Sequence, residues 1–225
     1  MIRIENVSKS YLKNKVLDKV SLAVKSGEFV SIVGQSGAGK TTMVRLLIGE
    51  ERADEGKVFV GDWDITRLSQ REVPFLRRQI GVIFQDFKLL PKKTLAENVS
   101  FALEVSGGSR EKIKKIVPSV LKIVGLDGKG DRYPHEVSGG ERQRAAIARA
   151  LVHQPKMLLA DEPTGNLDAI NADEIIELLL RINRFGTTVI LVTPNKEIVN
   201  RLNRRVVTMD RGHIVSDKEH GKYLL

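Results

Sequence analysis

The strongest constraint on the fold is the stretch Gly34–Thr41, which matches the pattern G-x-x-x-x-G-K-[ST]. The apolar run Phe29–Val33 leads into this stretch and Thr42–Ile48 leads out of it, so we predict a strand, a glycine-rich loop and a helix in succession. Glycines let successive backbone N–H groups point inward, and a helix N-terminus adds partial positive charge. The loop is therefore predicted to bind a polyphosphate.

Individual residues of this loop have predicted roles. We expect Lys40 to reach the β- and γ-phosphates and Thr41 to place its hydroxyl on Mg²⁺. The remaining predicted phosphate-binding residues are Gly34, Gln35, Ser36, Gly37, Ala38, Gly39 and Thr42. The alternative is a glycine-rich turn without a ligand, which the flanking strand and helix disfavour.

Composition indicates an ordinary soluble globular chain of one or two domains. The 225 residues are 41% hydrophobic and include no cysteine, which excludes disulfides and cysteine-based metal sites. The chain begins with strand-like alternation rather than a signal peptide, and no apolar run is long enough to span a bilayer. We therefore expect a cytoplasmic protein.

The formal net charge is +9, from 37 Lys and Arg residues against 28 Asp and Glu residues. Such an excess attracts nucleic acid, anionic lipid or acidic partners. The basic residues are scattered and few aromatic residues lie among them. We therefore favour a membrane-adjacent position and expect no specific nucleic acid.

Strands and helices alternate along most of the chain. Further strands are predicted at residues 2–7, 20–25, 56–61, 80–84, 157–161, 188–192, 205–209 and 213–215, and helices at residues 69–79, 95–105, 113–124 and 172–184. Pro118 falls inside one of these helices and is expected to kink or divide it. The alternation implies βαβ units and a parallel sheet covered on both faces, so the predicted fold class is α/β.

Two further motifs carry polar groups. Asp161 and Glu162 follow an apolar predicted strand at its carboxyl end, where open α/β sheets bind ligands. We expect Asp161 to hold Mg²⁺ through water and Glu162 to polarise the water that attacks the γ-phosphorus. Upstream, Ser138 and Glu141 form a predicted capping box, which alone could explain that segment. Two glycines between them make a second anion-binding helix end, which the chain's own phosphate loop does not need.

The order of these motifs resembles that of the ATP-binding cassette ATPases over nearly the whole chain. The matching positions are Tyr11, Gly34–Thr41, Gln85, Ser138–Gln143, Asp161, Glu162 and Asn166–Asp168. The resemblance implies a single ABC ATPase domain spanning residues 1–225. Its catalytic core would hold a mostly parallel sheet with an antiparallel β subdomain (residues 1–85 and 151–225), and residues 86–150 would form an inserted α-helical subdomain.

The resemblance also implies ATP and Mg²⁺ as cofactors and a homodimer that closes head to tail around two ATP molecules. Tyr11 would stack on adenine, Gln85 would contact Mg²⁺ and the attacking water, and Asp168 would couple the two sites. The groups that would contact the γ-phosphate of the opposite subunit belong to Ser138, Gly139 and Gly140. The implied catalytic residues are Glu162, Gln85 and Lys40, and the implied metal-site residues are Thr41, Gln85 and Asp161.

Within that family, the segments Phe84–Pro91 and Thr94–Val99 look most like those of the bacterial cell-division ATPases. This implies an FtsX-like integral membrane subunit as partner, control of peptidoglycan hydrolysis, and a peripheral position on the cytoplasmic face of the inner membrane. Phe87 would either dock that subunit or pack inward. The alternatives are a lipoprotein-releasing or macrolide-export ATPase and, in another class, a nucleotide-sensing or nucleic-acid-binding cassette module with little hydrolysis.

One position departs from the family's pattern. Pro194 stands where the family has a histidine that contacts the γ-phosphate, and proline offers neither a side-chain donor nor a backbone N–H. Losing a positioned polar group at a developing charge costs about two to three orders of magnitude in rate. We therefore expect ATP binding and dimerisation to survive and hydrolysis to be slow, unless Thr193 or Asn195 substitutes.

Overall fold

The computed structural model describes residues 1–223, which fall into two compact units. Unit 1 comprises residues 1–77 together with the C-terminal part of the chain from residue 183, and unit 2 comprises Arg78–Ile182. Among the described residues, no helix is long and apolar enough to cross a membrane. The predicted subdivision at residues 85 and 150 stays a prediction.

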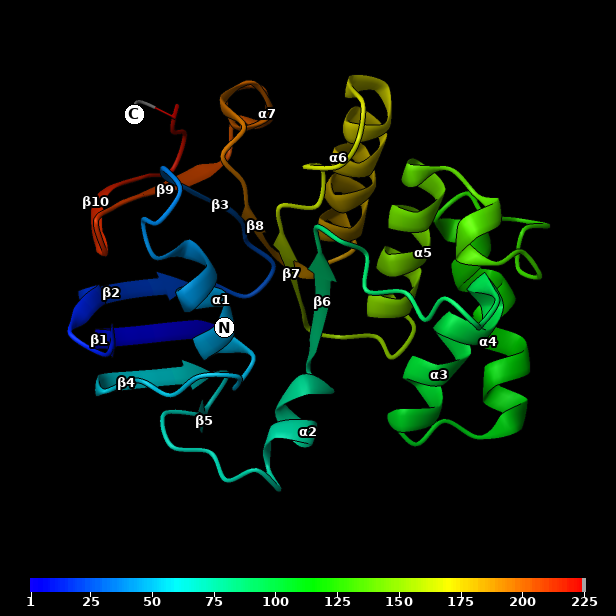
Figure 1. Cartoon of the computed structure of the whole chain (residues 1–225), viewed down its shortest axis with the longest axis horizontal. Coiled ribbons are helices and arrows are strands. Elements are labelled where there is room, and N and C mark those ends of the chain that lie inside the picture. The colour runs from blue at the N-terminus through cyan, green and yellow to red at the C-terminus, as the bar shows by residue number, and fades with distance from the viewer. Residues whose placement is uncertain (224–225) are drawn as a thin grey trace. The chain divides into compact units, whose positions relative to one another are not determined.

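Unit 1 contains a four-stranded antiparallel sheet in the order β2-β1-β4-β5 (Figure 1). Its strands are β1 (Ile2–Tyr11), β2 (Asn14–Val24), β4 (Glu55–Val60) and β5 (Trp63–Asp64). The strand predicted at residues 20–25 begins earlier, because the tight turn after Tyr11 pairs that residue with Asn14. The antiparallel β subdomain is thus present.

The second sheet segment of unit 1 places β3 (Phe29–Val33) between β8 (Thr188–Val192) and β9 (Arg205–Asp210), all parallel. The edge strand β10 (His213–Lys218) pairs antiparallel with β9. Every residue of β3 and β8 is buried, as expected for apolar strands covered on both faces. This arrangement delivers the phosphate loop from the carboxyl end of a central strand.

Three helices belong to unit 1: α1 (Lys40–Leu47), α2 (Val73–Arg77) and α7 (Lys196–Leu202). The helix predicted at residues 69–79 is wrong in its start, because Ser69 and Glu72 hydrogen-bond to each other in a turn and α2 begins at Val73. Pro74 lies in the first turn of α2, where its missing N–H costs no hydrogen bond. The short helix α7 was not predicted.

Unit 2 combines the parallel strands β6 (Ile80–Phe84) and β7 (Met157–Asp161) with helices. The helices are α3 (Leu95–Val105), α4 (Arg110–Ile123), the short 3₁₀ helix η1 (Pro134–Glu136), α5 (Gly139–Leu151) and α6 (Ala169–Arg184), whose last two residues lie in unit 1. Helices α3, α4 and α5 pack against one another (Figure 1). The helices predicted at residues 95–105 and 113–124 and the α/β fold class are thus confirmed.

Two capping boxes are formed, and the one at Ser138 confirms the prediction. Thr94 and Glu97 bond reciprocally at the start of α3, and Ser138 and Glu141 do so at the start of α5. The sequence predicts a kink or a division of the helix at Pro118, and the division is wrong, since α4 runs unbroken through this residue. Pro118 is exposed, so water can satisfy the carbonyl that loses its helical partner.

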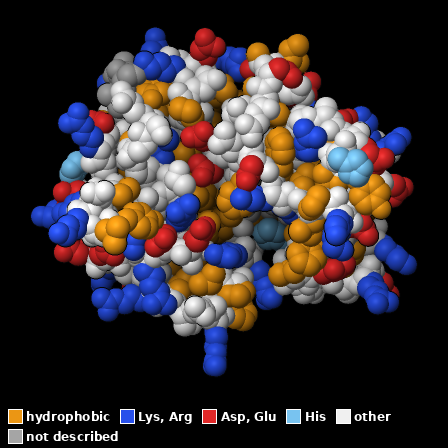
Figure 2. All heavy atoms as spheres, in the orientation of Figure 1, with side chains coloured by type: hydrophobic (Ala, Val, Ile, Leu, Met, Phe, Trp, Pro, Cys, Tyr) orange, Lys and Arg blue, Asp and Glu red, His pale blue; other side chains and the backbone are white. Residues whose placement is uncertain are grey.

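Charged side chains are dispersed on the face drawn in Figure 2, where Lys and Arg lie among Asp and Glu rather than gathering in one patch. Nucleic-acid binding proteins present a basic stripe or patch that tracks the phosphate backbone. This face therefore gives no support to the nucleic-acid alternative.

Candidate functional site

The loop between β3 and α1 passes through backbone conformations that favour glycine. Gly34 has a φ of 151°, and a Cβ there would lie 2.2 Å from the carbonyl oxygen of Met209. Gly39 has a φ of 101°, and a Cβ there would lie 2.7 Å from the side chain of Leu17. Both positions therefore require glycine for two reasons, the left-handed conformation and the close approach.

The turn between β9 and β10 holds the loop from behind. The backbone N–H of Gly212 donates to the carbonyl oxygen of Ala38 over 3.2 Å, and the Gly212 carbonyl accepts from the N–H of Asp18 over 3.0 Å. These bonds connect the loop to β2 through the turn between β9 and β10. These backbone hydrogen bonds hold the loop without using any side chain on its inner face.

Lys40 lies buried within the curve of the loop, with only 6% of its surface exposed. Its ammonium donates to the carbonyl oxygens of Gly34 over 2.8 Å and Gln35 over 3.0 Å. Helix α1 has no side chain that caps its N-terminus and no acidic residue in its first turn. No residue of α1 therefore neutralises the positive N-terminal end of this helix. Together with the Lys40 ammonium, that end can bind an anion.

Thr41 and Thr42 occupy the first turn of the same helix. Thr41 is exposed, as a hydroxyl that contacts a ligand must be, whereas Thr42 is buried. The predicted phosphate-binding residues 34–42 are thus one continuous structural element.

Tyr11 ends β1, opposite Asn14 in the hairpin. The ammonium of Lys9 lies 5.5 Å from the centre of its ring, within the range of a cation–π contact. The Tyr11 hydroxyl is buried, and among the described residues it has no hydrogen-bond partner. The ring itself is partly exposed.

The carboxyl ends of β6 and β7 bring three predicted site residues together in unit 2. The register pairs Phe84 with Asp161, so Gln85 and Glu162 follow side by side at the same sheet edge. Glu162 has a φ of 49°, in the left-handed region that non-glycine residues avoid. Such a conformation costs about 1–3 kcal/mol and is concentrated at functional sites.

The loop after β7 is joined to Gln85. The side-chain amide of Asn166 donates to the Gln85 carbonyl oxygen over 3.0 Å. A Cβ at Gly165 would lie 2.7 Å from the Gln85 side-chain nitrogen. The side chain of Gln85 therefore lies directly on the backbone of this loop.

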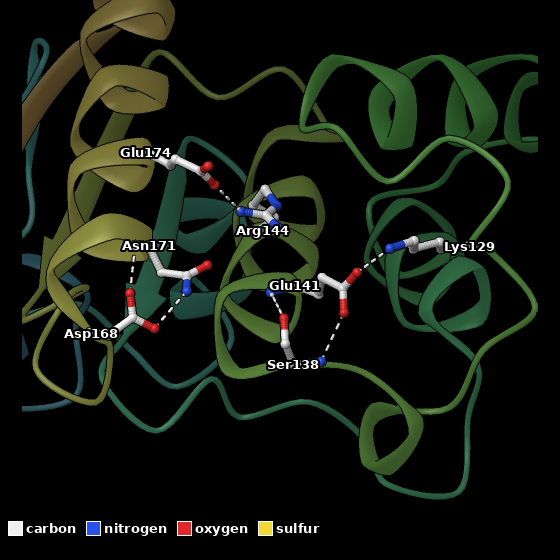
Figure 3. A network of polar contacts seen from close by, with 7 residues as sticks. All are labelled: Lys129, Ser138, Glu141, Arg144, Asp168, Asn171 and Glu174. Atoms are coloured by element: carbon white, nitrogen blue, oxygen red, sulfur yellow. Dashed lines mark hydrogen bonds and ion pairs between the residues drawn. The ribbon is translucent and has the colours of Figure 1, made fainter.

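The N-terminal end of α5, residues 138–140, is called the signature end below. Ser138 accepts a hydrogen bond of 3.2 Å from the Glu141 N–H, and Glu141 accepts one of 2.8 Å from the Ser138 N–H (Figure 3). Lys129 forms an ion pair with the same carboxylate, and these contacts lower the pKa of Glu141 to about 2. Because the Ser138 hydroxyl oxygen is the acceptor in this cap, its own proton is free to donate to an anion.

Asp168 caps α6. Its carboxylate accepts from the Asn171 N–H over 2.9 Å and from the Asn171 side-chain amide over 2.7 Å (Figure 3). These bonds lower the pKa of Asp168. Asn171 was missed in the sequence, where an asparagine three residues after an aspartate at a helix start is the available signal.

The segment after Gln85 contains two successive left-handed residues, Phe87 at φ 59° and Lys88 at φ 49°. The guanidinium of Arg149 in α5 donates to both carbonyl oxygens, over 2.8 Å to that of Phe87. A second guanidinium, that of Arg142, lies 5.5 Å from the centre of the Phe87 ring. The half-buried Phe87 is thus held by α5, the helix that carries the signature end.

Pro194 is exposed and follows β8. The buried Thr193 hydroxyl oxygen accepts from the Asn195 N–H over 3.1 Å, and the Asn195 side chain caps α7 by accepting from Ile198 over 3.0 Å. Thr193 and Asn195 are the two residues that could substitute for the missing histidine. The side-chain oxygen of each thus accepts a hydrogen bond within this segment.

None of the four histidines takes the place of the missing one in the contacts described here. His213 lies 3.9 Å from Asp18, the His220 ring faces the carbonyl of Asn203, and the His135 ring stacks on Tyr133. Burial lowers the pKa of His153, which favours its neutral form. None of these contacts involves the phosphate loop.

The three implied metal-site residues carry oxygen donors. Thr41, Gln85 and Asp161 offer hydroxyl, amide and carboxylate oxygens, which are the ligands that Mg²⁺ prefers. Within residues 1–223 no cluster of three His, Cys, Asp or Glu side chains is formed. Mg²⁺ commonly takes one or two protein oxygens together with phosphates and water, so each of these donors is of a kind that suits it.

Comparisons with known proteins agree with this geometry. Residues 17–165 match the family model described as "ABC transporter". The chain is 49% identical over 224 residues to the cell division ATP-binding protein FtsE of Streptococcus pneumoniae, covering 99% of this chain and 97% of that protein. It is 46% identical over 224 residues to FtsE of Bacillus subtilis, covering 99% and 98%.

Among solved structures, the fold is similar to the dimeric ATP-binding cassette MJ0796 in a post-hydrolysis state with ADP and Pi. The TM-score is 0.88 at 33% identity, covering 99% of this chain and 100% of that chain. With a family model that matches more than half of its residues, the chain belongs to the ABC transporter family.

Proposed function

We propose that this chain is the ATP-binding and ATP-hydrolysing subunit of an ABC-type membrane complex. The observation that carries the proposal is the loop from β3 to α1, where the Lys40 ammonium and the uncapped helix end lie together. Both features attract a polyphosphate. The similarity to proteins named cell division ATP-binding protein supports ATP as the ligand.

In the nucleotide complex, Lys40 exchanges its loop carbonyl partners for the β- and γ-phosphates. Tyr11 stacks on adenine, its partly exposed ring already accompanied by the Lys9 ammonium. The ligands of Mg²⁺ come from Thr41, Gln85 and Asp161. When bound, this ion neutralises charge that develops on the phosphates.

Glu162 is proposed as the general base, with Gln85 positioning the attacking water. The left-handed backbone of Glu162 supports this role, because strain of that kind persists where function requires a fixed side-chain direction. Pro194 offers no donor to the γ-phosphate, so turnover is slow by about two to three orders of magnitude relative to a chain with the histidine.

Two copies of the chain close on two ATP molecules. The Ser138 hydroxyl and the N–H groups of Gly139 and Gly140 bind the γ-phosphate held by the other copy, and Asp168 couples the two sites. The similarity to a cassette solved as a dimer with ADP and Pi supports this arrangement. Hydrolysis removes the γ-phosphate that bridges the copies and reopens the dimer.

The membrane partner is an FtsX-like integral subunit, and the complex acts in cell division by controlling peptidoglycan hydrolysis. The name of the bacterial relatives, cell division ATP-binding protein FtsE, supports this process and disfavours a lipoprotein-releasing or macrolide-export role. The chain then lies on the cytoplasmic face of the inner membrane. We further propose that residues 1–85 and 151–225 act as the catalytic core and residues 86–150 as the helical subdomain.

The direct test is light scattering of the purified chain without nucleotide, with Mg-ADP and with Mg-ATP. A mass near twice 25.1 kDa with Mg-ATP alone is the expected result. Co-purification with an FtsX-like subunit, and its loss in Phe87→Asp but not in Phe101→Asp, identifies the docking segment. A monomer under all three conditions contradicts the proposed closure.

A further inference from the structure

Gly140 lies in the first turn of α5, and its backbone conformation does not itself require glycine. Glycine inside a helix costs roughly 1 kcal/mol relative to alanine, and Gly140 is not among the residues with positive φ. Its neighbour Gly139 has room for a Cβ, whose nearest contact would be the Leu167 side chain at 3.4 Å. The requirement at Gly140 therefore comes from a specific neighbour.

That neighbour is Asn171 in the first turn of α6. A Cβ at Gly140 would lie 1.9 Å from the Asn171 side-chain oxygen and 2.6 Å from its Cγ. The amide of Asn171 thus occupies the space of a Cβ at 140, and a larger residue there would require the Asn171 side chain to move. Helices α5 and α6 meet here through a bare backbone and one side chain.

The other end of the same amide is bonded to Asp168. The Asn171 side-chain nitrogen donates to the Asp168 carboxylate over 2.7 Å, so one side chain touches both Gly140 and the Asp168 loop (Figure 3). A second connection between the two helices, Arg144 with Glu174 at 2.7 Å, lies further along α6. This ion pair involves neither Asn171 nor Asp168 (Figure 3).

We infer that Asn171 is a positioning residue that couples the signature end to the Asp168 loop within one chain. The inference rests on the proposed closure, in which these two segments meet the other copy. When the signature end binds a γ-phosphate, Asn171 holds Asp168 in the orientation that the other copy engages. Without the amide, Asp168 must be ordered during closure, which weakens the closed dimer.

The test measures the dissociation constant of the ATP-bound dimer in a Glu162→Gln background, which keeps ATP intact. Asn171→Ala removes the amide from both copies, and Asn171→Asp keeps its shape and its backbone N–H but cannot donate to Asp168. One hydrogen bond lost per copy predicts dimers about tenfold weaker for Asn171→Ala and at least as weak for Asn171→Asp. Glu174→Gln, on the same helix, is the matched control and changes the constant by less than about twofold.

A second-site experiment distinguishes this role from simple damage. Gly140→Ala displaces the amide and weakens the dimer, whereas Gly140→Ala combined with Asn171→Ala has room for both methyl groups and returns to the level of Asn171→Ala alone. An Asn171→Asp dimer as tight as the parent, or a double variant as weak as Gly140→Ala, overturns the inference. If the background protein itself remains monomeric with ATP, the proposed closure is wrong and the inference falls with it.

Discussion

The guanidinium of Arg149 in α5 donates a 2.8 Å hydrogen bond to the carbonyl oxygen of Phe87, across 62 positions of the chain. It also bonds the carbonyl of Lys88, the second of two successive left-handed residues. The segment proposed to meet the membrane subunit is thus fastened to the helix whose N-terminus is the signature end. A displacement of the Phe87 segment is therefore transmitted directly to α5 through Arg149.

Replacing Arg149 by methionine keeps an apolar stem of similar length and removes both hydrogen bonds. We expect the free energy of unfolding to fall by about 1–2 kcal/mol, because the part-buried carbonyl of Phe87 and the exposed carbonyl of Lys88 both lose a charged donor. Urea unfolding measures this. Arg110→Met, at an exposed position of α4, is the control and changes stability by less than about 0.5 kcal/mol. Equal effects of the two substitutions would show that the contact is not stabilising.

Replacing Lys40 by methionine removes the ammonium that lies within the phosphate loop. We expect ATP affinity to fall about ten- to hundredfold, the loss of one or more charged hydrogen bonds. Binding of a fluorescent ATP analogue measures it. Arg45→Met on the exposed side of the same helix is the matched control and should bind as the parent does. Unchanged affinity in Lys40→Met would remove the basis of the proposed site.

Replacing Lys129 by methionine tests the ion pair at the signature end. The pKa of Glu141 is about 2 in the folded protein against an ordinary 4.5, so the ionised carboxylate stabilises the fold above pH 4.5 and this contribution is lost as the pH falls toward 2. Lys129 is half exposed, so its share at pH 7 is at most about 1 kcal/mol. Urea unfolding of both proteins at several pH values should show the difference shrinking over that window. A difference independent of pH would contradict the assignment.

The local features of the site were predictable because their signals lie within a few residues of one another. The phosphate loop, the capping boxes of Thr94 and Ser138, and the order of strands all follow from short patterns. The register of β6 and β7 then brings Gln85 beside Glu162 without further information.

The contacts that sequence reasoning missed are those that depend on how distant segments pack. Asn171 against Gly140 and Arg149 against Phe87 each require two elements to meet in a particular register. The unbroken helix through Pro118 depends on solvent on that side of α4, which a sequence pattern does not specify. The strained backbone of Glu162 and Phe87 has no sequence signal either.

The most direct test of the account is steady-state Mg-ATP hydrolysis by this chain beside its Pro194→His variant, with the dimer fraction followed by light scattering. The account predicts that both proteins dimerise on Mg-ATP and that the histidine variant turns over about two to three orders of magnitude faster. Equal rates would contradict it, because another group would then fill the role that Pro194 leaves open.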